Sequence, residues 1–221
     1  MSSTKKKNSN LEAARSRMYH DLIFDCAERV FAEKGFDECT MQDVAAEAGI
    51  SLKTLYTAFP GKNEIYAEIQ AVRGTAFLDQ VRGAGDGTTA LEKLDAGIRA
   101  FVTYLVDHDA YRRILLREGH AWGLDPVTEN TREHWRAGVT HVAAVLRQGM
   151  DEGVFHDGDA ELLAASVTAV MQVQLAGRLF RSGNQSNARE IADGTLVVLR
   201  RMLCVDPDAP SGRDHELAKA S

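Results

Sequence analysis

Three short helical stretches follow one another within residues 15–66, and each ends at a residue that breaks helices. The first stretch is followed by Gly35, which stands at the position of a helix C-cap. The second is followed by Gly49, and Pro60-Gly61 breaks the third. Two helices joined by a tight glycine-containing turn form a helix-turn-helix unit. The spacing of these breaks therefore predicts a small three-helix unit of that kind.

Local signals also mark where the second and third of these helices begin. Thr40, followed three residues later by Asp43, resembles a capping box with Asp in place of the usual Glu, and predicts a helix as far as Ala48. Ser51 can cap the next helix, which runs to Phe59. Apolar residues recur at three- and four-residue steps, and we expect them to form the shared core. They are Leu22, Ile23, Cys26, Ala27, Val30, Phe31, Val44, Ala45, Ala48, Ile50, Leu55 and Phe59.

The second helix of a helix-turn-helix lies in the DNA major groove and reads base edges near its N-terminus. The residues expected to face outward from that helix are Leu52, Lys53, Thr54, Tyr56 and Thr57. Lys53 can donate to guanine or to a phosphate, the two threonines can hydrogen-bond or touch a thymine methyl group, and Tyr56 can reach a phosphate. Lys62, at the start of the next helix, and Thr40 offer further anion contacts. Short three-helix units also serve as interaction modules, so spacing alone leaves that alternative open.

The run from Ala48 to Lys62, read as AGISLKTLYTAFPGK, resembles the signature of the TetR family of transcriptional regulators. The upstream AEKGF of residues 32–36, Thr40 and Val44-Ala45 agree with it, and the match covers residues 15–66. The resemblance implies a homodimer with two N-terminal DNA-reading heads. It also implies a C-terminal domain that binds a small-molecule effector and thereby releases a palindromic operator.

Carried over by position, the resemblance assigns Thr40, Tyr56 and Lys62 to phosphate contacts. It assigns Lys53, Thr54 and Thr57 to base or phosphate contacts. Leu52 and Ala58 depart from the family pattern, which leaves fewer polar side chains to read bases. The alternative function is an all-helical ligand-binding or interaction protein without sequence-specific DNA binding.

The remainder of the chain also has helical periodicity, so the fold class predicted is all-α, with a larger helical domain after the helix-turn-helix domain. Further helices are expected at residues 88–106, 110–121, 126–149, 159–179 and 188–204. The predicted organisation is a basic disordered arm (1–14), a DNA-binding domain (15–66), an effector and dimerisation domain (67–204) and a flexible tail (205–221). The arm, within residues 1–20, carries five basic residues and one acidic residue, and either contacts phosphates or is a solvated tail.

Large and polar-aromatic residues of the C-terminal domain are candidates to line an effector pocket, although a core role is the favoured interpretation of each one taken alone. They are Phe101, Tyr104, Trp122, Trp135, His141, Met171 and Gln174. The helix from Leu162 to Leu179 is apolar almost all round, which requires burial on two sides. Either it is a core helix, or one side and the following helix meet a partner subunit. The residues expected at that dimer interface are Ala165, Val170, Gly177, Leu196, Leu199 and Leu203.

Several classes of protein are disfavoured. The glycines of residues 82–87 lack the strand and the Gly-Lys-Ser/Thr of a phosphate loop, and no hydrolase or metalloprotease motif occurs. Three cysteines without ligand spacing argue against a metal or a disulfide framework, so we expect no enzyme activity, cofactor or metal. No membrane span or signal sequence is expected, which favours a cytoplasmic chain. The net charge of −6 lies mostly beyond Arg73, because residues 1–73 hold ten basic and eleven acidic residues.

Overall fold

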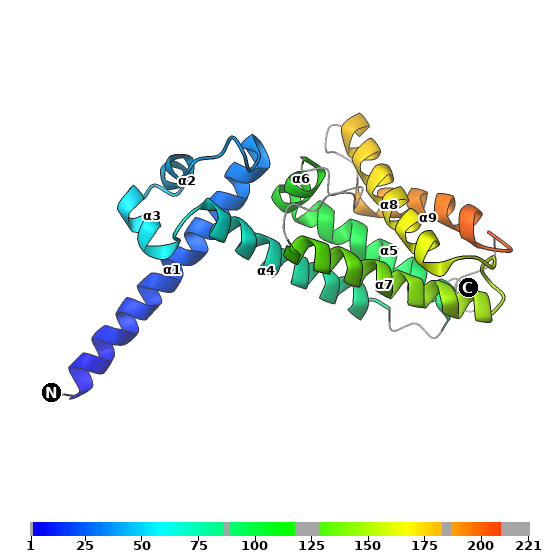
Figure 1. Ribbon diagram of the computed structural model, residues 1–221, viewed down its shortest axis with the longest axis horizontal. Coiled ribbons are helices and arrows are strands. Elements are labelled where there is room, and N and C mark those ends of the chain that lie inside the picture. Colours follow the sequence, from blue (N-terminus) through cyan, green and yellow to red (C-terminus); the bar gives the residue numbers. More distant parts are fainter. Residues whose placement is uncertain (1, 86–88, 118–128, 183–186, 209–221) are drawn as a thin grey trace, which may run out of the picture. The chain divides into compact units, whose positions relative to one another are not determined.

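The computed structural model describes residues 2–85, 89–117, 129–182 and 187–208, and these residues are almost entirely helical (Figure 1). The helices are α1 (Ser2–Lys34), α2 (Met41–Glu47), α3 (Leu52–Ala58), α4 (Lys62–Gly83), α5 (Ala90–Asp107), α6 (Asp109–Arg117), α7 (Glu129–Asp151), α8 (Ala160–Ser182) and α9 (Ala188–Leu203). The one β-type pairing among the described residues is an isolated antiparallel bridge between Phe155 and Cys204. The all-α prediction is confirmed.

The short helices begin where the capping signals predict. The Thr40 side chain accepts a hydrogen bond from the Asp43 N–H at 3.2 Å, and the Thr40 N–H donates to the Asp43 carboxylate at 2.9 Å, which completes the capping box of α2. The Ser51 hydroxyl accepts from the Thr54 N–H at 3.1 Å and caps α3. Gly35 and Gly49 have φ of +85° and +64°, which explains why glycine ends α1 and α2.

The first helix is longer than the sequence pattern suggests. The arm expected at residues 1–14 is helical from Ser2 onward and continues into α1 without a break. No glycine or proline stands between Ser2 and Lys34 to stop the helix. The pattern of apolar residues marks only the part of α1 that packs against other helices, because an exposed helical turn needs no apolar stripe.

One of two compact units consists of residues 1–72 and 110–118. Within it α1, α2 and α3 pack against one another (Figure 1). Ile23, Val44 and Leu55, one from each helix, are completely buried. Leu22, expected in the same stripe as Ile23, is 39% exposed, because it lies at the edge of the buried face. Helix α6 belongs to this unit although it is far away in sequence, so the unit extends beyond the predicted residues 15–66.

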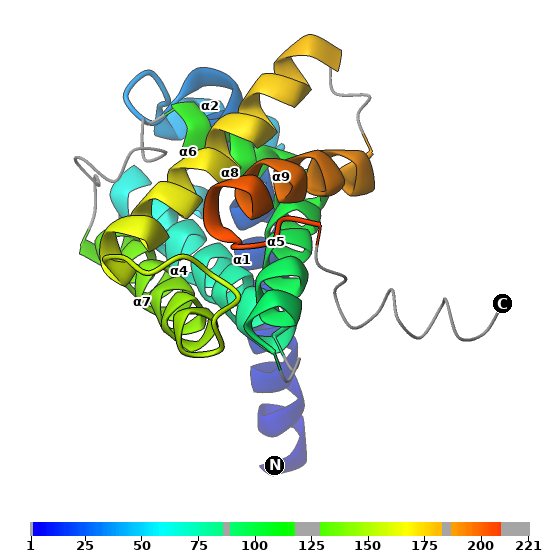
Figure 2. The same cartoon turned by 90° about the vertical axis from the view of Figure 1, so that its right-hand side faces the viewer.

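The second unit consists of residues 73–109 and 119–221. Helix α5 packs against α7 and α9, and α8 packs against the same two helices, so the four close into a bundle (Figure 2). Its interior includes Ile98, Leu146, Leu175 and Leu199, which are 0–2% exposed. A nearly buried ion pair between Asp95 and Arg200 joins α5 to α9.

Candidate nucleic-acid interface

Helix α3 is held by one buried face and presents the other to solvent. Leu55 is completely buried and Phe59, at the C-cap of α3, is only 3% exposed, as the sequence predicts. Lys53, Tyr56 and Thr57 are exposed, and the Tyr56 side chain remains 49% accessible. A phenol and a cation are therefore presented on a rigidly anchored helix, which is the arrangement that base and phosphate contacts require.

The threonine hydroxyls of α3 are already oriented by local hydrogen bonds. The Thr57 hydroxyl donates to the Lys53 carbonyl at 2.8 Å, so its oxygen and methyl group remain available to a ligand. The Thr54 and Ser51 hydroxyl oxygens lie 2.8 Å apart and share a hydrogen bond. These bonds restrict the rotamers of both threonines, which lowers the entropy lost when they contact a base.

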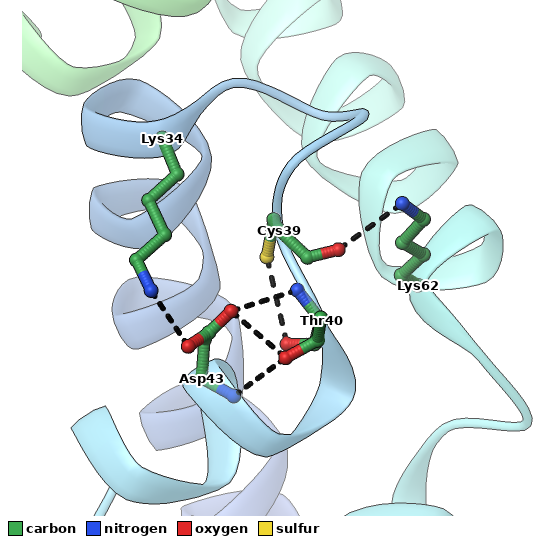
Figure 3. Close-up of polar contacts among 5 residues, drawn as sticks. All are labelled: Lys34, Cys39, Thr40, Asp43 and Lys62. Carbon is green, nitrogen blue, oxygen red and sulfur yellow. Dashed lines mark hydrogen bonds and ion pairs between the residues drawn. The ribbon is translucent and has the colours of Figure 1, made fainter.

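A second polar network surrounds the start of α2 (Figure 3). The Asp43 carboxylate accepts from the Thr40 hydroxyl at 2.8 Å and lies 2.6 Å from the Lys34 ammonium. Lys34 and the two Thr40 donors hold the pKa of Asp43 at about 2, well below its ordinary value. The Thr40 hydroxyl is predicted to contact a phosphate. In the structure its single proton is instead donated to the Asp43 carboxylate.

The Lys62 ammonium is also engaged within the protein. It donates to the carbonyl oxygens of Phe36 at 2.8 Å, Asp37 at 3.1 Å and Cys39 at 3.1 Å. The six predicted DNA-binding residues therefore divide into two groups. Lys53, Thr54, Tyr56 and Thr57 lie on α3, whereas Thr40 and Lys62 belong to the network around the loop between α1 and α2. The sequence pattern did not reveal the three carbonyl contacts of Lys62, which join positions 23–26 residues apart.

The residues predicted to line an effector pocket occupy different environments. Phe101, Tyr104 and Met171 are buried, and Trp135, His141 and Gln174 are half-buried, whereas Trp122 lies outside the described residues. Phe77 of α4 contacts the rings of both Phe101 and Tyr104, at centroid distances of 5.5 and 5.4 Å. The Tyr104 hydroxyl donates to the Arg73 carbonyl at 2.9 Å. These contacts give Phe101 and Tyr104 a packing role whether or not a ligand is bound.

Helix α7 carries two partly buried histidines, His134 and His141. Burial lowers the pKa of His141 and of His134, and the charge of Arg82 lowers both further. A cavity of about 180 Å³ between the α7–α8 turn and α9 contains none of the predicted ligand residues. It is lined by His156, Asp157, Gly158, Asp159, Leu162, Leu163, Met202 and Leu203.

The residues predicted at a dimer interface do not all face solvent. Leu196, Leu199 and Leu203 are 0–5% exposed and pack inside their own unit, so the prediction that they meet a partner is corrected. They share one face of α9 with the buried Ile191 and Thr195, at steps of three and four residues. Other positions of α9, Val197, Val198 and Met202, are exposed. The spacing of Leu196, Leu199 and Leu203, at three and four residues, marks the buried side.

Helix α8 has an apolar surface larger than its own unit covers. Ala165, Val170 and Gly177 are half-buried, while Leu162 and Val173 are 66% and 47% exposed. Among the described residues, the segment Ala160–Leu179 is long and apolar enough to span a bilayer, with a mean hydropathy of 1.3. The sequence analysis predicts no such segment. The core helix of a soluble protein meets the same criterion. Only 28% of this segment is buried within the single chain.

A helix-turn-helix head followed by a helical bundle defines a class of DNA-binding transcriptional regulators. Residues 23–69 match the family model described as bacterial regulatory proteins, tetR family, and residues 87–203 match the tetracyclin repressor-like C-terminal domain. The chain belongs to the TetR family of ligand-responsive transcriptional regulators.

Characterised relatives agree over most of the chain. The transcriptional repressor KstR2 of Rhodococcus jostii is 30% identical over an alignment of 194 positions, which covers 80% of this chain and 87% of KstR2. KstR2 of Mycobacterium tuberculosis is 27% identical over 80% of this chain and 88% of its own. The structure of the latter, described as a ketosteroid transcriptional regulator, has a TM-score of 0.73 at 23% identity, covering 85% of this chain and 95% of KstR2. The crystal structure of AibR in complex with isovaleryl coenzyme A and operator DNA has the same fold, with a TM-score of 0.67 at 20% identity. The match covers 80% of this chain and 95% of AibR.

Proposed function

We propose that this chain is a dimeric repressor that reads a palindromic operator with α3 and is released when a small molecule binds the C-terminal domain. The observation that carries the proposal is the exposed face of α3, on which Lys53, Thr54, Tyr56 and Thr57 are supported by the buried Leu55. A helix in this position is the reading element of a helix-turn-helix.

We assign one function to each of the segments that the sequence predicts. We assign DNA reading to residues 15–66 and effector binding and dimerisation to residues 67–204, with the tail at 205–221 outside both. The basic segment 1–14 adds electrostatic attraction to phosphates without contributing sequence specificity. Residues 1–73 carry nearly equal numbers of basic and acidic residues, ten and eleven. Specific affinity for DNA therefore rests on a few cations at defined positions rather than on a uniformly positive surface.

A partner subunit accounts for the uncovered apolar surface of the C-terminal unit. Ala165, Val170 and Gly177 of α8 remain part of the proposed interface, and Val197, Val198 and Met202 of α9 replace the buried leucines. Two copies of α8 and α9 form a four-helix seam in such a dimer. A symmetric dimer places two α3 helices on one DNA face, and this matches the two half-sites of a palindrome.

The effector is a small molecule bound among the helices of the C-terminal unit, where helical proteins commonly hold ligands. Phe101, Tyr104, Trp122, Trp135, His141, Met171 and Gln174 remain the proposed lining residues. Isovaleryl coenzyme A is a suitable first probe because AibR, which has the same fold, has been determined with it. KstR2 is described as a ketosteroid regulator, so steroid ketones form the second set of probes.

The decisive experiment is selection of bound sequences from a random DNA pool by the full-length protein. The selected duplex is then titrated against a scrambled duplex of equal length by fluorescence anisotropy. We expect a palindromic sequence that outcompetes the scrambled duplex by at least about 10³-fold. Equal binding of both duplexes would support the alternative, an all-helical ligand-binding protein without sequence-specific DNA recognition. Addition of each probe ligand to the complex then tests release.

A further inference from the structure

Helix α4 is unbroken, but its residues are divided between the two compact units at position 73. From Arg73 onward the helix belongs to the second unit. Two side chains of that unit contact α4 at this point. The Tyr104 hydroxyl of α5 donates to the Arg73 carbonyl at 2.9 Å, and the His134 ring of α7 lies against Gly74. Helices α5 and α7 therefore both contact α4 where its second segment begins.

Gly74 is explained by the ring beside it. It lies inside a regular helix, where glycine is less favourable than alanine. Its φ is not positive, so the backbone conformation does not require glycine. A Cβ atom at position 74 would lie 2.6 Å from His134 Nδ1 and 2.9 Å from His134 Cε1, which is closer than side-chain atoms approach one another in proteins. The absence of a side chain at position 74 is therefore matched to the size of the histidine ring.

The His134 ring also suits this contact in its charge. Burial lowers the pKa of His134 and the charge of Arg82 lowers it further, while Glu133 acts in the opposite direction. A neutral imidazole can pack on a helix backbone without the cost of burying an unpaired charge. The second ring nitrogen, Nε2, lies 3.5 Å from the Thr75 hydroxyl oxygen, so the ring runs along two consecutive residues of α4.

Tyr104 contacts the preceding residue of α4 and is itself firmly held. It is 2% exposed, and its ring lies 5.4 Å from the Phe77 ring and 4.0 Å from the His108 ring, measured between centroids. These contacts fix the direction of the ring and hence the position of its hydroxyl beside the Arg73 carbonyl. Because Arg73 and Gly74 are consecutive, the contacts from α5 and α7 meet at one point of α4.

We infer that Gly74 and His134 form a size-matched contact which, together with the Tyr104 hydroxyl, fixes α4 in the C-terminal unit and thereby sets operator affinity. His134 is a positioning residue in this scheme. Since α4 is one continuous helix, a displacement at Gly74 is carried along it into residues 62–72, which belong to the unit that contains α3. A reading head that is not held in place before binding must be ordered during binding, which lowers affinity. The inference rests on the proposed function.

An exchange of side-chain sizes tests the contact. Gly74→Ala places a methyl group against the ring, and adding His134→Ala to the same chain makes room for that methyl group. Gly97→Ala is the matched control, because the nearest atom to a Cβ at this helical glycine of α5 is Val81 Cγ1 at 4.0 Å. Ile191→Val, in the buried core on α9, lowers the stability of the same unit without changing α4, α5 or α7. Operator affinity of each full-length variant is measured by fluorescence anisotropy with the selected duplex, and sedimentation velocity reports the oligomeric state.

For Gly74→Ala we expect dimers whose operator affinity is about tenfold or more below that of wild type. His134→Ala should lose less, and the double variant should bind at least as well as His134→Ala, because the added methyl group fills part of the space that the ring leaves. Such non-additivity is the mark of two residues in direct contact. Tyr104→Phe, which removes only the hydroxyl, should lower affinity about threefold or more. Gly97→Ala and Ile191→Val should bind as wild type.

Wild-type affinity in Gly74→Ala would overturn the inference, and so would a double variant that binds no better than Gly74→Ala. An equal loss of affinity in Gly97→Ala or Ile191→Val would overturn it as well, because affinity would then follow stability alone. If Gly74→Ala does not fold, an unfolded double variant or wild-type affinity in Tyr104→Phe would count against the inference in the same way. Failure of wild type to prefer its selected duplex over the scrambled one would instead refute the proposed function.

Discussion

The Lys34 ammonium of α1 lies 2.6 Å from the Asp43 carboxylate of α2, and this ion pair joins the first helix to the cap of the second. The carboxylate also accepts two hydrogen bonds from Thr40, through its hydroxyl and its backbone N–H. One side chain therefore completes a capping box and an interhelical contact together. Its charge is required for the ion pair and strengthens the hydrogen bonds of the cap, which makes this part of the chain sensitive to acid.

The pKa of Asp43 predicts the direction of that sensitivity. In the folded chain the pKa is about 2, compared with an ordinary value of 3.8. A lowered pKa means that the charged form stabilises the fold, so the contribution is complete above about pH 4–5 and is lost as the pH falls through about 2. We expect Asp43→Asn to lower the melting temperature at pH 7 and to make its decline between pH 5 and pH 2 less steep. Thermal unfolding followed by circular dichroism over that range measures both effects.

Asp25→Asn is a suitable control, because Asp25 is an exposed carboxylate on the same helix as Lys34. The control variant should keep the acid dependence of wild type. If Asp43→Asn and wild type lose stability in parallel below pH 5, the carboxylate of Asp43 does not support the cap.

Tyr56 offers a direct test of the reading face. It is exposed, so Tyr56→Ala should leave the melting temperature of the free protein nearly unchanged. A hydrogen bond to a charged phosphate is worth about 1.5–3 kcal/mol, so operator affinity should fall by about 10- to 150-fold. Anisotropy titrations with the selected duplex provide the measurement. Val72→Ala, at an equally exposed position on α4, should bind as wild type; loss of affinity there and not at Tyr56 would place the DNA contact on a different face.

The capping residues and the buried face of α3 could be predicted because the information is local. Thr40, Asp43 and Ser51 lie within three residues of the backbone groups that they cap, and Leu55 stands out by helical spacing. The contacts of Lys62 could not be predicted in this way. Its acceptors are backbone carbonyls, which every residue possesses, so no side-chain pattern marks them.

The buried and exposed sides of α9 could be predicted only in part from the sequence. Leu199 and Val198 are adjacent aliphatic residues, and composition alone does not say which one faces the core. Their spacing from Leu196 and Leu203 does, since residues three and four apart share a face and Leu199, unlike Val198, is three and four residues from these two. Membership of α6 in the head unit was beyond the reach of the sequence, because it depends on long-range packing that leaves no local pattern.

Leu55 is the buried side chain that we expect to hold α3 in its orientation. It is completely buried, and truncation of a buried leucine costs about 2–5 kcal/mol. We expect Leu55→Ala to destabilise the head by that amount and to weaken operator binding through loss of the folded head. Hydrogen exchange of the α3 amides, compared with those of α5, measures whether the loss is local. Equal protection of α3 in the variant and in wild type would show that Leu55 does not hold the helix.

From the exposed residues of α9 we can predict which substitution should separate the subunits of the proposed dimer. Val198 is 38% exposed, whereas the neighbouring Leu199 is completely buried in its own unit. A charge buried at a subunit interface without a partner is strongly unfavourable, so Val198→Glu should give folded monomers with weakened operator binding. Leu199→Ala should instead cost about 2–5 kcal/mol of folding stability while the folded protein remains dimeric. Sedimentation velocity gives the oligomeric state and circular dichroism the helical content. A Val198→Glu variant that sediments as an intact dimer would place the interface elsewhere, because a glutamate side chain cannot remain charged and unpaired within an apolar seam.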